Sequence, residues 1–332
     1  MSTQPTVVNI GSRKSALALK QTDLVIAALQ RLHPHIDFRV NSINTAGDKD
    51  QATALYNFAG KGLWTNELEA MLAANSVDFI VHSLKDMPTV IPDGFSLACI
   101  TEREDPRDVL VVKASLASQY RSLADLPAGS VVGTSSIRRI AQLKRRHPGL
   151  RFADVRGNIQ TRLAKLDDPA GPFSAIILAA AGLLRMDSGA RIAQYLDSDS
   201  AGILHAVGQG AIGVEARDGD DRIAQLLAGI QHEQTMLACS AERSVMRTLE
   251  GGCSVPIGVE TKWADQVLSL KATVVKADGS EGVDVQEKRV VTTVDEAEAF
   301  GNEVAKKLSD LGADKILEGI NALKHKAPTK SS

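Results

Sequence analysis

The sequence has few of the residues that build disulfide frameworks or metal sites. Its 332 residues include only three cysteines, Cys99, Cys239 and Cys253, and seven histidines. Three widely spaced cysteines provide neither a set of paired bridges nor a CxxC metal motif, and the histidines show no ligand spacing such as HExxH. We therefore expect no disulfide framework and no bound metal.

Long apolar runs and a strong net charge are also missing. No apolar stretch approaches the roughly 20 residues of a membrane span, and the start, MSTQPTVVNIG, lacks the basic and apolar regions of a secretory signal. A formal net charge of -2 creates no global field that would attract nucleic acid or an anionic membrane. We expect a cytoplasmic protein without nucleic-acid or membrane partners, in which any anion binding is local.

The composition is that of an ordinary globular protein, with 44% apolar residues, and the length is typical of two or three domains. Up to about residue 205, short apolar strands alternate with amphipathic helices, which predicts largely parallel sheets covered by helices on both faces. Later segments favour an α+β unit. The strands are expected at 7–10, 38–43, 77–81, 109–112, 130–132, 152–155, 175–178, 210–217 and 268–275, and the helices at 17–32, 63–74, 136–146, 159–166, 223–229, 236–249 and 297–311.

Basic side chains and hydroxyls follow several of the predicted strands. They occur in SRKS (residues 12–15), SLKD (83–86), TSSIRR (134–139) and RGN (156–158). Ligands of open α/β sheets bind beyond the carboxyl ends of the strands, and Arg162 and Arg185 are placed to join the same edge. One such arginine alone is more often a solvated surface charge. The whole group indicates a polyanionic small ligand, and a polycarboxylate is favoured because the glycine-rich GxxxxGK[ST] phosphate loop is absent.

Two other motifs have a structural explanation. Residues 208–213 match GxGxxG, but a dinucleotide fingerprint needs a following helix, whereas residues 211–215 are typical of a strand. The basic run KRRH at 144–147 is compatible with nucleic-acid binding. It is better explained as the end of an amphipathic helix, where cations complement the helix dipole.

Asp86 and Cys253 each allow a structural and a functional interpretation. Asp86 follows an apolar strand and precedes Met87-Pro88, so it is either a turn cap paired with Lys85 or a carboxyl group that exchanges protons with a ligand. Cys253 follows a glycine pair in EGGCSVPIG, and it is either a small buried apolar residue or a nucleophilic attachment point on an adaptable turn.

Taken together, the motifs closely resemble the porphobilinogen deaminase (hydroxymethylbilane synthase) family. The resemblance runs in order from about Asn9 to Leu323 and is carried by VHSLKD (81–86), EDPRD (104–108), GTSSIRR (133–139), RGN (156–158), AVGQG (206–210) and LEGGC (249–253). It implies two α/β domains that resemble type II periplasmic binding proteins and a smaller α+β C-terminal domain. The implied limits are 1–110 plus 206–230, then 111–205, then 231–332.

The resemblance implies a monomeric transferase of tetrapyrrole and haem biosynthesis. Such an enzyme joins four porphobilinogen molecules head to tail into hydroxymethylbilane and releases ammonia at each addition. It implies a covalent dipyrromethane cofactor held as a thioether by Cys253, and Asp86 as the catalytic acid. Arg13, Arg138, Arg139, Arg156, Arg162 and Arg185 would bind carboxylates, and Ser15, Lys61, Ser83, Lys85, Thr134, Ser136 and Gln209 would add contacts. Asn57 stands where many bacterial members have a lysine, so one cationic contact differs.

Two rival hypotheses remain open at the level of sequence. One is a binding module without catalysis, in which two α/β lobes close on an anion and Cys253 is merely buried; it predicts no covalent adduct. The other is a cysteine-dependent hydrolase, which needs a general base near Cys253 that the sequence does not identify.

Overall fold

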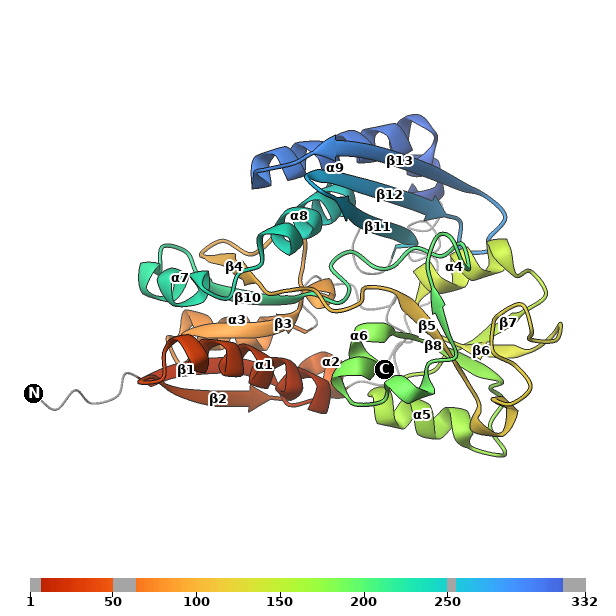
Figure 1. Cartoon of the computed structure of the whole chain (residues 1–332), viewed down its shortest axis with the longest axis horizontal. Coiled ribbons are helices and arrows are strands. Elements are labelled where there is room, and N and C mark those ends of the chain that lie inside the picture. The colour runs from red at the N-terminus through yellow and green to blue at the C-terminus, as the bar shows by residue number, and fades with distance from the viewer. Residues whose placement is uncertain (1–6, 50–63, 250–254, 319–332) are drawn as a thin grey trace, which may run out of the picture.

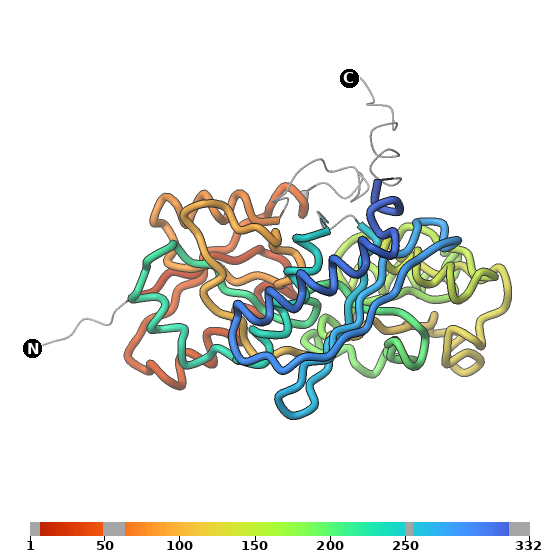
Figure 2. Tube along the Cα trace, turned by 90° about the horizontal axis from the view of Figure 1, so that it is seen from above, coloured from red at the N-terminus to blue at the C-terminus, as the bar shows by residue number. Residues whose placement is uncertain are grey.

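The computed structural model describes residues 7–49, 64–249 and 255–318. These residues form three units, two of them built on five-stranded sheets and one on a three-stranded sheet (Figure 1). Seen from above, the third unit lies across the junction between the other two (Figure 2). The protein therefore has two α/β domains and a smaller α+β domain, which confirms the predicted fold class.

The first sheet has its helices on both faces. Phe79 and Val81 of its middle strand pack with helix residues such as Leu29 on one side, whereas Ile80 packs with Leu68 on the other, because alternate side chains of a strand point in opposite directions. The strand order is β2 (Asp37–Ile43), β1 (Val7–Arg13), β3 (Phe79–Ser83), β10 (Ile212–Arg217) and β4 (Phe95–Ile100). The helices of this unit are α1 (Ala16–Leu32), α2 (Ala46–Lys49), α3 (Asn66–Ala73), η2 (Leu84–Asp86) and α7 (Asp221–Ala228).

The second sheet repeats the topology of the first. In each sheet three strands are parallel, and the strand in fourth position is antiparallel to both neighbours and arrives from the other domain. The order is β7 (Arg151–Ala153), β6 (Val131–Gly133), β8 (Ala175–Ala179), β5 (Asp108–Val112) and β9 (Gln194–Leu196). The helices are η3 (Ala114–Leu116), α4 (Ile137–Arg146), α5 (Ile159–Asp167), α6 (Ala180–Arg185) and η4 (Gly189–Arg191).

This shared topology fixes where ligands can bind. Basic residues lie in the segments that begin at the carboxyl ends of β1 and β3 in one sheet and of β6 and β8 in the other. Two chain segments, residues 101–107 and 197–211, cross between the sheets. The two α/β domains thus share one sheet topology, although the sequence shows no internal repeat.

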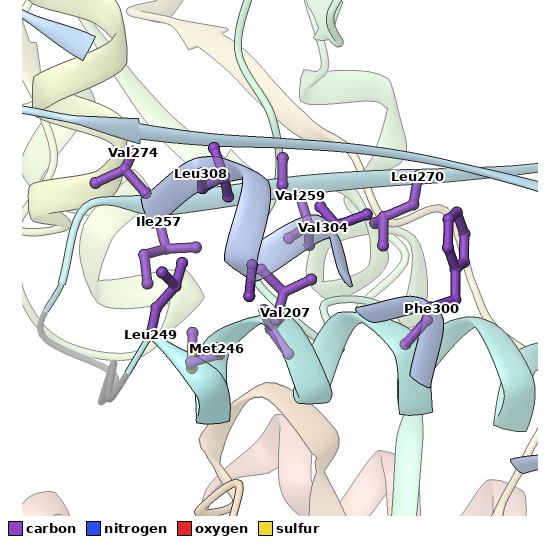
Figure 3. Close-up of a cluster of buried hydrophobic side chains, with 14 of the residues drawn as sticks. Val207, Met246, Leu249, Ile257, Val259, Leu270, Val274, Phe300, Val304 and Leu308 are labelled. Atoms are coloured by element: carbon purple, nitrogen blue, oxygen red, sulfur yellow. The ribbon is translucent and has the colours of Figure 1, made fainter. Parts of the chain in front are cut away.

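The third domain packs two helices on one face of an antiparallel sheet. Its core contains Phe300, Val304, Leu270, Val274 and Ile257, all almost fully buried (Figure 3). Helix α9 begins with a capping box between Thr293 and Glu296. The elements are α8 (Glu233–Thr248), β11 (Ile257–Ala264), β12 (Val267–Val275), β13 (Gly282–Val290) and α9 (Val294–Asp310).

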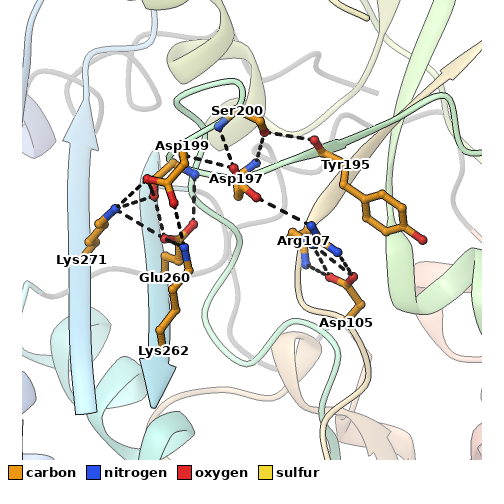
Figure 4. Close-up of polar contacts among 10 residues, drawn as sticks. Asp105, Arg107, Tyr195, Asp197, Asp199, Ser200, Glu260, Lys262 and Lys271 are labelled. Carbon is orange, nitrogen blue, oxygen red and sulfur yellow. Dashed lines mark hydrogen bonds and ion pairs between the residues drawn. The ribbon is translucent and has the colours of Figure 1, made fainter. Parts of the chain in front are cut away.

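Ion pairs join the third domain to the two crossing segments. In the first segment, Arg103 donates to both carboxylate oxygens of the fully buried Glu242 of α8, at 2.7 and 3.0 Å. At the start of the second, the turn Asp197–Ser200 meets β11 and β12: Ser198 donates to Glu260 at 2.6 Å, and Asp199 pairs with Lys262 at 3.1 Å (Figure 4). The third domain is therefore attached where the other two are connected.

The structure corrects several sequence-based boundaries. Strand β1 extends to Arg13 instead of ending at residue 10, and β4, β9 and α6 were not predicted. Strand β5 starts at Asp108 and belongs to the second sheet. As expected, a strand and not a helix follows the GxGxxG match. Within the described residues, no helix is long and apolar enough to cross a bilayer.

Gly301 allows the closest approach between α8 and α9. A Cβ atom at this position would lie 2.2 Å from the Ala241 carbonyl oxygen and 2.7 Å from Ser244 Cβ. The backbone atoms on α8 cannot move aside without shifting the helix, so the contact between the two helices depends on the missing side chain.

We predict that Gly301→Ala destabilises the protein although alanine is the better helix former. The gain of about 1 kcal/mol in helix propensity is outweighed by an overpacking cost of roughly 1 to 3 kcal/mol. Urea unfolding should show a lower free energy of unfolding. Gly149→Ala is the matched control, since its Cβ would have only ordinary contacts at 3.7 Å or more. A Gly301→Ala protein as stable as the wild type would contradict this account.

Candidate active site between the two α/β domains

The first domain contributes the residues that follow β1 and β3. Arg13 is the last residue of β1, and Ser15 caps α1 by accepting a hydrogen bond from the Ala18 N–H at 3.3 Å. Ser83 ends β3 and donates to Gln21 Oε1 at 2.9 Å. Lys85 and Asp86 lie in η2, directly after this strand. Because β1 and β3 are parallel, their carboxyl ends share one edge of the sheet.

Arg13 is held on three sides next to Asp86. Its Nε and Nη2 donate to the Asp48 carboxylate at 3.2 and 2.5 Å, and its guanidinium lies 4.1 Å above the centre of the Trp64 ring. The Trp64 ring also packs on Gly47, where a Cβ atom would lie 2.3 Å from the nearest ring atom. Burial disfavours the charged form of Asp48, but the hydrogen bond and charge of Arg13 hold its pKa below the usual value. Arg13 Nη1 then lies 3.8 Å from Asp86 Oδ2.

The second domain contributes the turn between β6 and α4. Thr134 is buried and its Oγ1 accepts from the Ser136 N–H at 3.2 Å, while Ser136 caps α4 by accepting from the Arg139 N–H at 3.5 Å. These hydroxyls fix the first turn of the helix. That turn carries Arg138 and Arg139, which are 5% and 6% exposed.

Both of these arginines bind the same carboxylate, Asp108 at the start of β5. Arg138 Nη1 donates to Oδ2 at 2.7 Å, and Arg139 donates to Oδ1 through Nε at 3.0 Å and Nη2 at 2.7 Å. Burial opposes ionisation of Asp108, but the charges and hydrogen bonds of the two arginines lower its pKa far below the usual value. Gln209, from the second crossing segment, donates to Asp108 Oδ1 at 2.9 Å.

Arg162 shows that the two domains face each other at this place. Its Nε donates to the Gly157 carbonyl at 2.7 Å. Burial, together with the like charges of Arg139 and Arg156, lowers the pKa of Arg162 to about 10, while the carboxylate of Asp86 in the other domain opposes the shift. Residues of α5, α4 and η2 therefore act on one another electrostatically.

The pKa of Lys85 is affected by burial and by several of the same charged residues. Burial is the largest effect on it, and with the charges of Arg139 and Arg138 it lowers the pKa of Lys85 to about 8, although Asp86 and Asp108 oppose the shift. This region contains more cations than carboxylates. The carboxylates are Asp48, Asp86 and Asp108, and the cations are Arg13, Lys85, Arg138, Arg139, Arg156 and Arg162. Such an excess suits a ligand with several negative charges.

Arg185 and Gln209 are tied to the crossing segments. Arg185 is buried, and its Nη2 donates to the Gly210 carbonyl at 2.7 Å. Gly210 has a φ of +88°, and a Cβ atom there would lie 2.3 Å from the Glu104 carbonyl oxygen, so glycine is needed where the two crossing segments touch. Gln209 Oε1 is a buried acceptor with no donor among the described residues.

Comparisons with known proteins agree along nearly the whole chain. The family model described as "Porphobilinogen deaminase, dipyromethane cofactor binding domain" matches residues 8–225, and "Porphobilinogen deaminase, C-terminal domain" matches residues 236–310. The porphobilinogen deaminase of Neurospora crassa is 58% identical, covering 97% of this chain and 96% of its own length. The chain belongs to the porphobilinogen deaminase family.

Further relatives of this family are similar over comparable lengths. The porphobilinogen deaminase of Yarrowia lipolytica is 54% identical over 95% of this chain and 93% of its own. That of Saccharomyces cerevisiae is 49% identical over 96% and 98%. Among solved structures, the periplasmic VFT2 domain of Bordetella pertussis BvgS has a TM-score of 0.39 and 15% identity, covering 69% of this chain and 88% of that one.

The structure brings the residues predicted for a porphobilinogen deaminase site together to different degrees. Contacts or mutual charge effects connect Arg13, Lys85, Asp86, Arg138, Arg139, Arg156 and Arg162. Ser15, Thr134 and Ser136 fix helix starts, Ser83 bonds within the first domain, and Arg185 and Gln209 bind the crossing segments. Lys61, Asn57 and Cys253 lie outside the described residues. The role of each side chain in binding stays a prediction.

The sequence-based set omitted three side chains that organise this site: Asp48, Trp64 and Asp108. Each acts on an arginine, and their partners lie 35, 51 and 30 or 31 positions away in the sequence. Asp108 stands in the EDPRD motif and Trp64 in the LWT segment, so both were visible as unusual residues. Their roles depend on which arginine the fold brings to them.

We predict that Lys85 titrates close to pH 8 and that Arg139→Gln raises its pKa, because the substitution removes a like charge from its surroundings. The measurement is a pH titration of the NMR signal of [13C]dimethylated Lys85, assigned by its loss in Lys85→Arg. In the control, Arg39→Gln, an exposed arginine of β2 is removed and the pKa should not move. A Lys85 signal that titrates like an ordinary surface lysine would contradict the burial and crowding described above.

Proposed function

We propose that this chain, a transferase of the porphobilinogen deaminase family, uses Asp86 to transfer protons and Cys253 to hold its primer while it joins four porphobilinogen molecules into hydroxymethylbilane. The observation that carries the proposal is the position of Asp86. It is a carboxylate, 31% exposed, among the cations of both α/β domains and 3.8 Å from Arg13. This arrangement offers a proton-transfer group inside an anion-binding region.

The cationic side chains fit the charges of the substrate. Each porphobilinogen carries an acetate and a propionate, so every pyrrole that enters the region brings two carboxylates. Arginine forks and the Lys85 ammonium bind carboxylates with charge-assisted hydrogen bonds, which are strengthened where water is excluded. Binding energy from these remote carboxylates would place the reacting carbon beside Asp86.

Asp86 would exchange protons with two groups of the reacting pyrroles, the leaving amino group and the attacking α-carbon. In its protonated form it can deliver a proton to the leaving amino group, so that the carbon–nitrogen bond breaks with release of ammonia. The remaining carboxylate then faces the cationic pyrrole and stabilises it electrostatically. After the new carbon–carbon bond has formed, the carboxylate can take up the proton that the attacking α-carbon loses.

The residues present also fit a dipyrromethane cofactor. When bound, this group supplies the pyrrole α-carbon to which the first substrate is added. Its carboxylates match the excess of cations, and the buried Gln209 Oε1 offers an acceptor for an N–H of a ligand. The family model of the cofactor-binding domain matches residues 8–225, which include the strands of both α/β domains.

Cys253 is supported as the attachment point by the state of the other two cysteines. Cys99 and Cys239 are both fully buried, and burial raises the pKa of each thiol to about 12. Neither can form a thiolate readily near neutral pH, and the thiolate is the nucleophile. The flanking residues Leu249 and Val255 are buried in the core of the third domain, which would anchor both sides of the attachment segment.

We further propose a cytoplasmic monomer with three domains. The proposed limits are 1–110 plus 206–230, then 111–205, then 231–332, and β5, which starts at Asp108, lies close to the first limit. The net charge of -2 supports a small-molecule partner and argues against nucleic acid or a membrane surface.

We predict that the protein, produced in a cell that makes porphobilinogen, carries a dipyrromethane adduct that Cys253→Ser abolishes. A serine hydroxyl is a much weaker nucleophile than a thiolate. Intact-protein mass spectrometry measures the adduct directly. Cys99→Ala and Cys239→Ala should retain it, since both thiols are buried. A wild-type mass equal to the bare chain would favour the binding module without catalysis.

We predict that Asp86→Asn folds and loads cofactor but loses at least about 100-fold in kcat, since general acid–base catalysis contributes about that much or more. Cofactor loading is checked by mass and turnover by the formation of hydroxymethylbilane. Asp93→Asn, an exposed residue on the connection after η2, is the matched control and should retain normal turnover. Normal turnover in Asp86→Asn would remove Asp86 from the mechanism.

A further inference from the structure

Asp108 is the most deeply buried of the three carboxylates Asp48, Asp86 and Asp108 of this site. It is 1% exposed, and its two oxygens accept four hydrogen bonds from three residues. Those residues are Arg138, Arg139 and Gln209, which all belong to the predicted substrate-binding set. They come from α4 and from the second crossing segment, so that one side chain connects two separate parts of the site.

The hydrogen bonds of Asp108 fix the direction of both guanidinium groups. Arg139 is held through its Nε and Nη2 edge, and its Nη1 donates to the Ile177 carbonyl at 2.8 Å. Arg138 is held through Nη1, which also donates to the Leu204 carbonyl at 2.6 Å. A planar guanidinium held along one edge, as in Arg139, can present its remaining N–H groups in only one direction, and the two acceptors of Arg138 Nη1 restrict that side chain.

Asp108 also compensates charge. Arg138 and Arg139 are both buried, so two positive charges lie side by side with little water. One negative charge between them allows the pair to remain in place while the region stays positive overall. A neutral side chain of the same shape would keep some of the hydrogen bonds and lose this compensation.

We propose that Asp108 is a positioning residue of the polymerisation site, which aims Arg138, Arg139 and Gln209 at the carboxylates and N–H groups of the bound pyrroles and supplies their shared counter-charge. This inference rests on the function proposed above. Asp108 acts through its three partners and does not itself need to touch the substrate.

The electrostatic part of the role has a consequence at Lys85. The charges that act on this ammonium include Asp86 from its own turn, Arg138 and Arg139 from α4, and Asp108 from β5. The two carboxylates raise the pKa of Lys85 and the two arginines lower it. Loss of the Asp108 charge lowers that pKa further, so Lys85 loses its proton at a lower pH. A residue that acted only through packing or neutral hydrogen bonds would not shift this titration.

Two variants of the cofactor-loaded enzyme test separately whether Asp108 orients its partner side chains and whether it supplies their counter-charge. Asp108→Glu keeps the charge but displaces the oxygens by one methylene. We expect the KM for porphobilinogen to rise roughly 10- to 100-fold, which corresponds to one lost charge-assisted hydrogen bond, while the basic limb of the kcat/KM profile stays in place. Asp108→Asn removes the charge, and we expect both a higher KM and a basic limb shifted to lower pH.

Asp78→Asn is the matched control. Asp78 precedes β3 at the opposite end from Ser83 and also accepts several hydrogen bonds, from the Asn9 N–H and from Arg222. Its loss should lower stability without changing the KM or the pH profile. A wild-type KM in Asp108→Glu, or an unshifted basic limb in a folded Asp108→Asn enzyme, overturns the proposal. Should Asp108→Asn not fold, the KM of Asp108→Glu decides alone.

A failure of the proposed polymerase function gives a different experimental result from a failure of the positioning role of Asp108. A wild-type protein that carries no pyrrole adduct and does not consume porphobilinogen would refute the proposed function whatever the Asp108 variants do. A wild-type enzyme that is loaded and active, with Asp108 variants that match it, would refute only the positioning role.

Discussion

The packing of like charges into a partly desolvated region is the constraint on which the rest of the site depends. Arg138 and Arg139 are almost fully buried, and burial together with neighbouring like charges lowers the pKa of Lys85 and of Arg162. Buried charges are costly unless they are paired and hydrogen-bonded. The site meets this cost with Asp48 and Asp108, which hold individual arginines but leave the region positive. A multiply charged acidic ligand would complete the charge balance.

The repeated topology of the two sheets explains how so many cations come together. In each sheet the parallel strands deliver their carboxyl ends to one edge, and the two crossing segments turn these edges towards each other. The antiparallel strand in fourth position belongs to one sheet but arrives from the other domain. The third domain binds both crossing segments through Arg103–Glu242 and Ser198–Glu260. Any relative movement of the α/β domains would therefore also involve the domain that carries Cys253.

Much of the fold and part of the site could be predicted because their patterns are local. The periodicity of α1, α4 and α9 and the apolar runs of β5 and β8 depend on neighbouring residues, and they were placed within a few positions. Strand β4 was missed because its burial depends on pairing with β10, far away in the sequence. Strand β9 and helix α6 are short, so they contain too few turns or alternations for a periodic signal. The motifs located Asp86 and the arginines, but not the carboxylates that orient them.

The sequence alone determined most of the strands and helices in their order, the family, and the set of basic residues that follow the parallel strands. These depend on residue type and local spacing, which the chain carries with it. Only the tertiary structure decided that Asp108 would bind both Arg138 and Arg139, and that Trp64 would lie against both Arg13 and Gly47. These contacts of Asp108 and of Arg13 with Trp64 join residues 30 to 51 positions apart, and side-chain electrostatics at a few ångströms depends on distances that no linear pattern records.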